Sequence, residues 1–87
     1  MKAPKTSVKR RIQIIKGQIA GLERMVEEDK YCIDILTLSL AIQHALKELD
    51  HLLMENHMRG CVQDGVKSGK PEKVTKELMQ LFEVIRK

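Results

Sequence analysis

A histidine and a cysteine lie four residues apart in the stretch ENHMRGC, which covers residues 55–61. Four residues are slightly more than one turn of an α-helix, so the side chains of His57 and Cys61 share a helix face and could hold one metal ion. Two ligands rarely make a stable site, and an isolated pair of this kind is more often a surface histidine beside a small core cysteine. Further ligands would have to come from elsewhere in the sequence.

The other cysteine, Cys32, lies in the stretch KYCID, 29 residues before Cys61. If residues 32 and 57 belong to one helix, they are roughly 37 Å apart along its axis, so Cys32 cannot reach His57 of its own chain. In an antiparallel pair of helices with its two-fold axis near Ala45 and Leu46, Cys32 of one protomer falls opposite His57 and Cys61 of the other. Symmetry then predicts two equivalent metal sites per dimer, each assembled between chains.

Two thiolates and one imidazole form a soft ligand set that suits Cu(I) or zinc. A closed structural zinc site requires four protein ligands, and the remaining histidines are poorly placed to supply one. His51 is six residues from His57 and points elsewhere on the helix, and His44 lies near the expected two-fold axis. We therefore interpret both as ordinary helix residues and predict three-coordinate Cu(I), one ion per protomer. Cys32 is expected in the first turn of its helix, where the helix macrodipole favours a thiolate.

The composition favours a small helical protein without catalytic activity. The sequence has 87 residues, of which 43% are hydrophobic, and no linker-like stretch in mid-chain, so we expect a single domain, residues 1–87. Its only aromatic residues are Tyr31 and Phe82, so the core must be aliphatic, which suits helix packing between chains. A cysteine and a histidine can serve nucleophilic catalysis, but three thin helices offer no obvious substrate pocket. We expect neither an enzyme nor a small-molecule substrate.

Hydrophobic periodicity predicts an all-α fold with three helices, at about residues 6–29, 30–63 and 71–86. We expect Thr6 or Ser7 to cap the first helix and Asp29 to cap the second, with Pro71 in the first turn of the third. The second helix would span roughly 48 Å. A monomer of this size cannot cover such a helix, which therefore needs a partner helix from another chain.

The charge is concentrated at the start of the sequence. The formal net charge is +4, from 16 basic and 12 acidic residues, yet the first 22 residues contain no acid. A basic segment of this kind attracts nucleic acid or anionic membrane, although a solvated helix face is the simpler alternative. This basic run makes Lys9, Arg10 and Lys16 candidate DNA contacts.

No stretch has the apolar core of a signal peptide or the length of a transmembrane helix. We expect a cytoplasmic protein with no membrane association, in which the two cysteines are reduced.

Most of the chain, from RRIQIIKGQIAGLERMVEEDKYCIDIL through LDHLLMENHMRGCV and into the third helix, resembles the copper-sensitive operon repressors and their relatives, the CsoR/RcnR-type metal-sensing transcriptional repressors. Members of this family differ in their ligand pattern. Copper sensors show Cys, His and Cys, which match Cys32, His57 and Cys61. Nickel and cobalt sensors have a second histidine in the last place and another near the N-terminus, and residues 1–10 contain none. Persulfide sensors lack the intervening histidine, and formaldehyde sensors lack the final cysteine.

The resemblance implies an antiparallel helical dimer that pairs into a disc-shaped tetramer and binds operator DNA without a helix-turn-helix. Apo protein would repress, and Cu(I) would release it and derepress genes for copper efflux or copper handling. Residues that the family uses to tie the metal-bound histidine to the fold match Tyr31 and Glu77. DNA-contacting cations match Arg11 and Lys47, and Lys47 stands where an arginine is expected, so it can neutralise a phosphate without bidentate geometry.

Two other functions use the same residues. A persulfide- or other thiol-sensing repressor of the same family would react at Cys32, but it has no need of the imidazole of His57. A copper-storage or buffer protein would use the same three ligands, but it gives no reason for an acid-free basic helix. Operator binding and the effect of losing His57 distinguish these alternatives.

Overall fold

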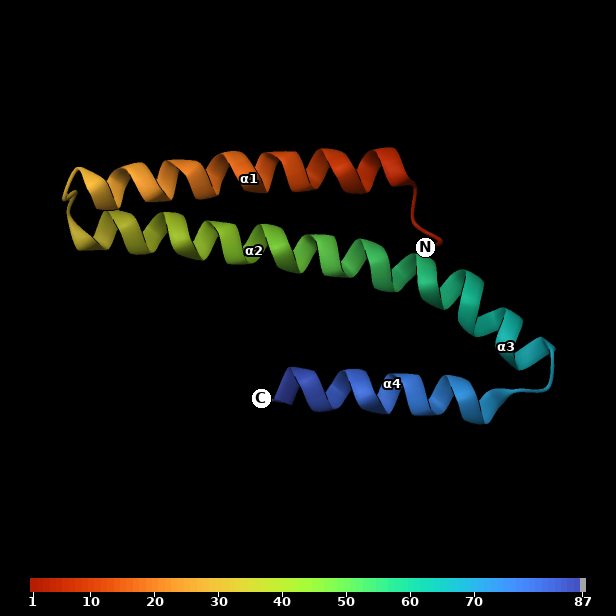
Figure 1. The fold of residues 1–87 in the computed structure, drawn as a ribbon. Coiled ribbons are helices and arrows are strands. Elements are labelled where there is room, and N and C mark those ends of the chain that lie inside the picture. Colours follow the sequence, from red (N-terminus) through yellow and green to blue (C-terminus); the bar gives the residue numbers. More distant parts are fainter. Residues whose placement is uncertain (87) are drawn as a thin grey trace.

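The computed structural model describes residues 1–86 and their side chains, except the side chains of residues 61–63 and 66. The fold is all-α, and within this described part the chain forms no strand. It is built from three helical arms (Figure 1), which confirms the predicted all-α protomer of three helices. The elements are α1 (Lys5–Glu27), α2 (Cys32–His57), the π-helix η1 (Met58–Val62), α3 (Gln63–Lys67) and α4 (Pro71–Arg86).

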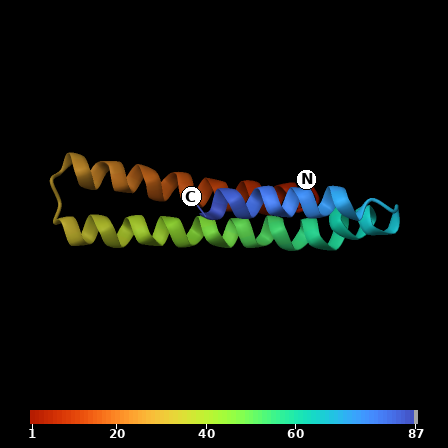
Figure 2. The same cartoon turned by 90° about the horizontal axis from the view of Figure 1, so that it is seen from below.

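The arms are arranged as two consecutive hairpins. Helices α1 and α2 run antiparallel, α2 continues without a break through η1 into α3, and α4 then folds back beside the end of α2 (Figure 1). The Cα positions extend over 56 × 30 × 13 Å, and seen from below the arms lie in a thin layer (Figure 2). The protomer is therefore a flat layer of helices rather than a globule.

The turn between α1 and α2 shows why the expected cap at Asp29 was wrong. Asp29 has a φ of 53°, and its N–H donates to the carbonyl of Val26 at 3.1 Å, while the N–H of Lys30 donates to the carbonyl of Met25 at 3.0 Å. These are the two hydrogen bonds of a Schellman motif, in which a left-handed residue ends a helix. Asp29 thus closes α1, and the N-cap of α2 is Tyr31.

The N-terminus of α1 also differs from the prediction. The helix begins at Lys5 rather than beside Thr6 or Ser7, and its N-cap is Pro4, which makes no side-chain cap hydrogen bond. Pro4 has φ −61° and ψ 121°, the extended conformation that an N-cap residue needs, and its ring fixes that φ. The carbonyl of Pro4 accepts the first helical hydrogen bond, from the N–H of Val8 at 3.1 Å.

The long helical arm extends beyond the end predicted near residue 63. It reaches Lys67, because the chain passes through the π-helix without a break and remains helical through Gly65. A second turn with a left-handed residue ends the arm: Gly69 has a φ of 77°, and the N–H of Lys70 donates to the carbonyl of Gly65 at 2.8 Å. This turn directs α4 back toward α2.

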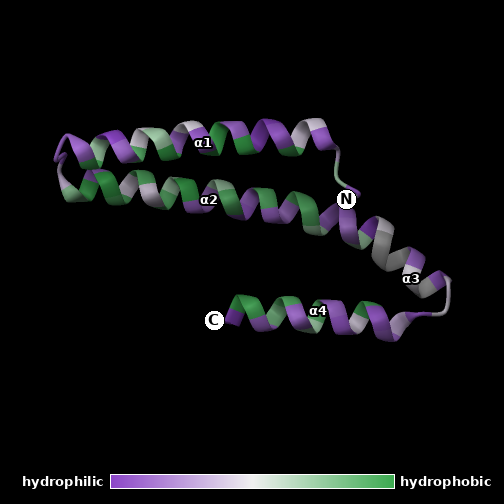
Figure 3. Cartoon of the chain, viewed as in Figure 1, coloured by the Kyte–Doolittle hydropathy of each residue, from purple (hydrophilic) through white to green (hydrophobic). Residues whose placement is uncertain are grey.

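The hydrophobic core is small. Within the described part, the buried hydrophobic residues are Ala3, Val8, Ile15, Ile42, Leu49 and Val74. Most of them lie on the facing sides of α1 and α2, where hydrophobic residues gather in Figure 3. Large apolar side chains remain exposed elsewhere, including Leu40 at 62%, Phe82 at 58% and Ile85 at 68%. One protomer therefore leaves much of its apolar surface without cover.

None of the helices in the described residues combines the length and the apolar character that a membrane span requires.

We predict that Gly65→Ala lowers the free energy of unfolding by about 1–3 kcal/mol, the usual range for overpacking. A Cβ at this position would lie 2.6 Å from Cγ2 of Val74, so the side chain of Val74 or the helix α4 that carries it would have to shift. Urea unfolding followed by circular dichroism measures the loss. The matched control is Gly21→Ala, where the new Cβ meets only ordinary contacts at 3.8 Å. Gly65→Ala combined with Val74→Ala should cost less than the sum of the single changes, and strict additivity would contradict the assigned clash.

Candidate metal centre

Cys32 is the first residue of α2, and its side chain is exposed. It follows Tyr31, the N-cap residue, whose side chain is 68% exposed. Both residues therefore lie at the turn between α1 and α2, with no covering element from their own chain. A thiol in this place is accessible to an ion or to a second protein chain.

His57 lies at the other end of α2, as its last residue. Its Nε2 is 3.5 Å from Oε2 of Glu77, which α4 brings alongside. The two side chains are 39% and 47% exposed, so the pair is half-buried. Histidines that bind metal commonly donate their second ring N–H to a carboxylate, which fixes the orientation of the ring. The observed contact leaves Nδ1 of His57 as the nitrogen available to an ion, so this residue fits a ligand role.

Cys32 and His57 share one face of α2 although they lie at its two ends. Twenty-five residues at about 100° each bring their directions to within about 20° of one another, while the axial rise separates them by roughly 37 Å. The structure shows that α2 is unbroken between them, so they cannot hold one ion within a single chain. Among the side chains that the structure describes, no group of three or more His, Cys, Asp or Glu residues is placed to hold a metal ion.

Cys61 lies within the π-helix Met58–Val62, and its side chain is outside the described ones. The sequence argument placed His57 and Cys61 one α-helical turn apart. The π-helix widens the hydrogen-bonded repeat from four residues to five, so the rotation between the two residues differs from the α-helical value. Single π turns occur frequently at functional sites, and this one contains a candidate ligand.

Sequence reasoning missed two contacts beside this segment. The aliphatic stem of Lys2 lies directly over Gly60, where a Cβ would come within 3.0 Å of Lys2 Cγ and Cδ, and Lys2 Nζ is 3.8 Å from Oδ2 of Asp64. The start of the chain thus packs against the π-helix. A glycine immediately before Cys61 was the only signal in the sequence for so close an approach.

The other candidate residues are not drawn to the same place. Tyr31 is separated from Glu77 of its own chain by the length of α2, so only Glu77 reaches His57. His44 and His51 are mostly exposed and lie 3.8 Å and 3.7 Å from glutamates four residues further along the helix. They are therefore arranged as ordinary surface residues of a helix.

The candidate DNA-contacting residues are exposed, and none of them forms an ion pair with another described residue. They do not share one face of α1. Lys9 and Lys16 are seven residues apart and point the same way, whereas Arg10 and Arg11 are rotated from Lys9 by about 100° and 160°. The remaining candidate, Lys47, lies on α2. It lines an open hollow of about 730 Å³ between α2 and α4, together with Asp50, His51 and His57.

Comparison with known proteins identifies relatives of this chain. Over 83 residues the chain is 40% identical to the copper-sensing transcriptional repressor CsoR of Bacillus subtilis (strain 168), and the matched region covers 95% of this chain and 82% of that protein.

The fold also matches solved structures. The copper-sensing repressor CsoR with Cu(I) from Geobacillus thermodenitrificans NG80-2 superposes with a TM-score of 0.91 at 34% identity, over 100% of this chain and 94% of the other. The nickel-responsive transcriptional regulator InrS superposes with a TM-score of 0.81 at 25% identity, over 95% and 93% of the two chains.

The model of one family, the metal-sensitive transcriptional repressors, matches residues 4–87. This is a family of DNA-binding repressors and not of enzymes, in agreement with the predicted class of function. The chain belongs to the metal-sensitive transcriptional repressor family.

Proposed function

We propose that the protein is a Cu(I)-responsive repressor that acts in the cytoplasm: its apo form binds operator DNA, and Cu(I) at a site shared between protomers releases it. The observation that carries this proposal is the placement of Cys32 and His57 on one face and at opposite ends of the unbroken helix α2. An antiparallel second copy would set Cys32 of one protomer against His57 and Cys61 of its partner. The similarity to copper-sensing repressors supports the choice of metal.

The ligand set fits Cu(I) by its chemistry. Two thiolates and one imidazole prefer a soft cation, and a three-coordinate site suits Cu(I) better than zinc, which favours four protein ligands. Cys32 and Cys61 would hold Cu(I) through their thiolates and His57 through its imidazole, and the ion would supply a fixed link between the two protomers. Glu77 would accept the N–H of Nε2 and so couple the orientation of the imidazole to the position of α4. Tyr31, beside Cys32 of the neighbouring protomer, would complete the surroundings of the ring.

The exposed apolar surface supports an assembly of several chains. Helix α2 keeps Leu36 at 54% and Leu40 at 62% exposure, and α4 keeps Phe82 at 58%. Completely burying an exposed side chain of this kind stabilises by about 1.5–3 kcal/mol, and these residues, which are half-exposed, would gain roughly half of that each. An antiparallel dimer that pairs into a disc-shaped tetramer would cover them, and it would also bring the basic residues of several α1 helices onto one DNA duplex.

The first test is an anaerobic fluorescence-anisotropy titration of the apo protein on its own upstream promoter DNA, followed by Cu(I). We expect release near one Cu(I) per protomer, and no release in Cys32→Ala or His57→Ala. Zn(II), Ni(II) and a persulfide donor serve as parallel arms. Release by Ni(II) alone would favour nickel sensing, which the similarity to a nickel-responsive regulator makes the second candidate function. Release by the persulfide donor alone, retained in His57→Ala, would indicate thiol sensing instead.

A mixed dimer tests whether each site is shared between chains. We expect Cys32→Ala protomers and His57→Ala/Cys61→Ala protomers each to lose Cu(I) binding as homodimers. Their tagged, co-purified heterodimer should bind one Cu(I), because the intact Cys32 of one chain meets the intact His57 and Cys61 of the other. Bathocuproine competition measures the stoichiometry. The control is a wild-type dimer made with the same two tags. If that control binds Cu(I) and the mixed dimer binds none, the shared site is contradicted.

The role assigned to Glu77 predicts a separation of binding from release. We expect Glu77→Gln to bind DNA and Cu(I) nearly as the wild type does but to lose most of the coupling between them, which is typically 1–3 kcal/mol, or about 5–150-fold in affinity. The loss of folding stability should stay below about 1 kcal/mol, because half-exposed ion pairs contribute little. Glu72→Gln, on the same helix, is the control. Full release by Cu(I) in Glu77→Gln would remove Glu77 from the mechanism.

A further inference from the structure

Four lysines lie within ten residues at the corner where α3 ends and α4 begins. Residues 67–76 contain Lys67, Lys70, Lys73 and Lys76 against the single acid Glu72, which gives 4 − 1 = +3. The corner lies at the end of the protomer farthest from the turn between α1 and α2 (Figure 1). It is the second basic concentration of the chain, after the start of α1.

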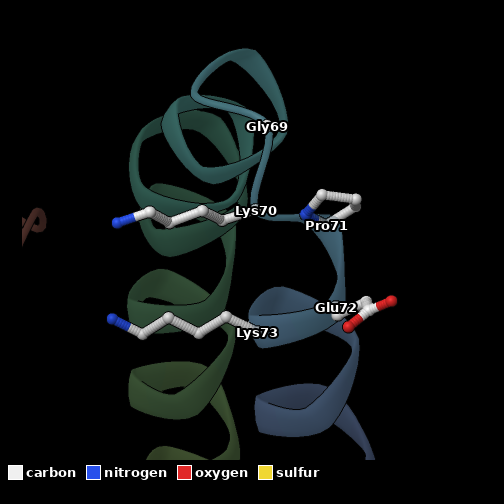
Figure 4. Close-up of a pocket in the computed structure, with 5 residues that line it drawn as sticks. All are labelled: Gly69, Lys70, Pro71, Glu72 and Lys73. Atoms are coloured by element: carbon white, nitrogen blue, oxygen red, sulfur yellow. The ribbon is translucent and has the colours of Figure 1, made fainter.

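The lysines of this corner are available to a ligand. Lys67, Lys70 and Lys73 are exposed, and none of them pairs with an acid among the described residues. Figure 4 shows Lys70 and Lys73 extending to the same side, whereas Glu72 points the opposite way. Both lysines line an open hollow of about 490 Å³ with Gly69, Pro71 and Glu72. The positive charge is therefore gathered on one side of the corner.

Neighbouring acids are directed elsewhere. The carboxylate of Asp64 lies 3.8 Å from Lys2 Nζ, and that of Glu77 lies 3.5 Å from His57 Nε2. The corner also has a defined shape, because the N–H of Lys70 donates to Gly65 and that of Ser68 donates to Asp64, at 2.8 and 2.9 Å. These two hydrogen bonds define the turn that carries Lys70.

We propose that Lys67, Lys70 and Lys73 contact phosphate groups of duplex DNA, as a site separate from the basic residues of α1. Lysine is a compact point charge that neutralises phosphates without reading bases. The first residues of the chain approach this corner, because Lys2 pairs with Asp64 of α3, and α1 then begins beside the middle of the long arm, where Ala3 and Val8 pack with Leu49. The two basic segments can therefore follow one DNA backbone. This inference rests on the proposed function.

The test compares the salt dependence of DNA binding. The variant Lys67→Gln/Lys70→Gln/Lys73→Gln removes three charges at the corner, and Arg24→Gln/Lys30→Gln/Arg86→Gln removes three charges elsewhere. Anisotropy titrations on promoter DNA between about 50 and 200 mM salt give the log–log slope, whose magnitude falls by about 0.9 for each phosphate that the protein no longer neutralises. We expect the slope of the corner variant to fall in magnitude by at least about 0.9 for each protomer that faces the DNA. Its response to Cu(I) should be kept. The control variant should keep the wild-type slope.

The outcomes separate this inference from the proposed function. Wild-type protein that does not bind DNA would overturn both. Wild-type binding with an unchanged slope in the corner variant, or with equal changes in both variants, would overturn the corner site alone. A further arm measures co-sedimentation with phosphatidylserine vesicles. Loss of vesicle binding in the corner variant with an unchanged DNA slope would assign the lysines to an anionic membrane and also overturn the proposal.

Discussion

The structure depends on one constraint: α2 is longer than the rest of the chain can cover. Helix α1 packs along one side of it, α4 reaches only its last turns, and large apolar residues such as Leu36 and Leu40 remain exposed. At about 25 cal/mol per Å² of apolar surface, such residues favour burial against another chain. The same length keeps Cys32 and His57 roughly 37 Å apart. In the proposed dimer, the pairing of α2 with a partner helix and the use of a partner's ligand would therefore have a common cause.

Two turns of the same type determine how the three arms lie. Each uses a left-handed residue, Asp29 or Gly69, to end a helix and reverse the chain. The second turn, together with the close approach of Gly65 to Val74, sets α4 in the register that brings Glu77 to His57. A half-exposed pair of this kind contributes roughly 0–1 kcal/mol. Ligand binding can make or break a contact of that strength, whereas a much stronger contact would hold the protein in a single conformation.

The sequence was sufficient to predict the three helical arms, because their apolar residues recur at steps of three and four over many turns. It also placed Cys32 in the first turn of its helix, although for the wrong reason. Asp29 looks like an N-cap because aspartate favours that position, yet it tolerates left-handed backbone and here ends the preceding helix. Such local alternatives are decided by the hydrogen bonds of the whole turn, which the residue type does not specify.

The π-helix was not predictable for a different reason. Inserting one residue changes the direction of side chains locally but leaves the apolar periodicity on either side intact, so residues 58–62 carry no distinct pattern. The π-helix affects the candidate metal centre, because the inserted residue changes the rotation between His57 and Cys61 about the helix axis. The packing of the Lys2 side chain over Gly60 could not be predicted either, because it depends on where the start of the chain packs.

The distribution of charge bears on how binding at one place could alter binding at another. Arg10 and Arg11 are rotated away from Lys9 and Lys16 around α1, so one protomer cannot turn all of its candidate cations toward one duplex. In the proposed assembly, DNA affinity would then depend on how neighbouring protomers are oriented, and a site shared between protomers is well placed to change that orientation. Linkage makes the effect reciprocal: DNA must weaken metal binding by the same factor by which metal weakens DNA binding. A shared site would thus act on DNA without lying near it.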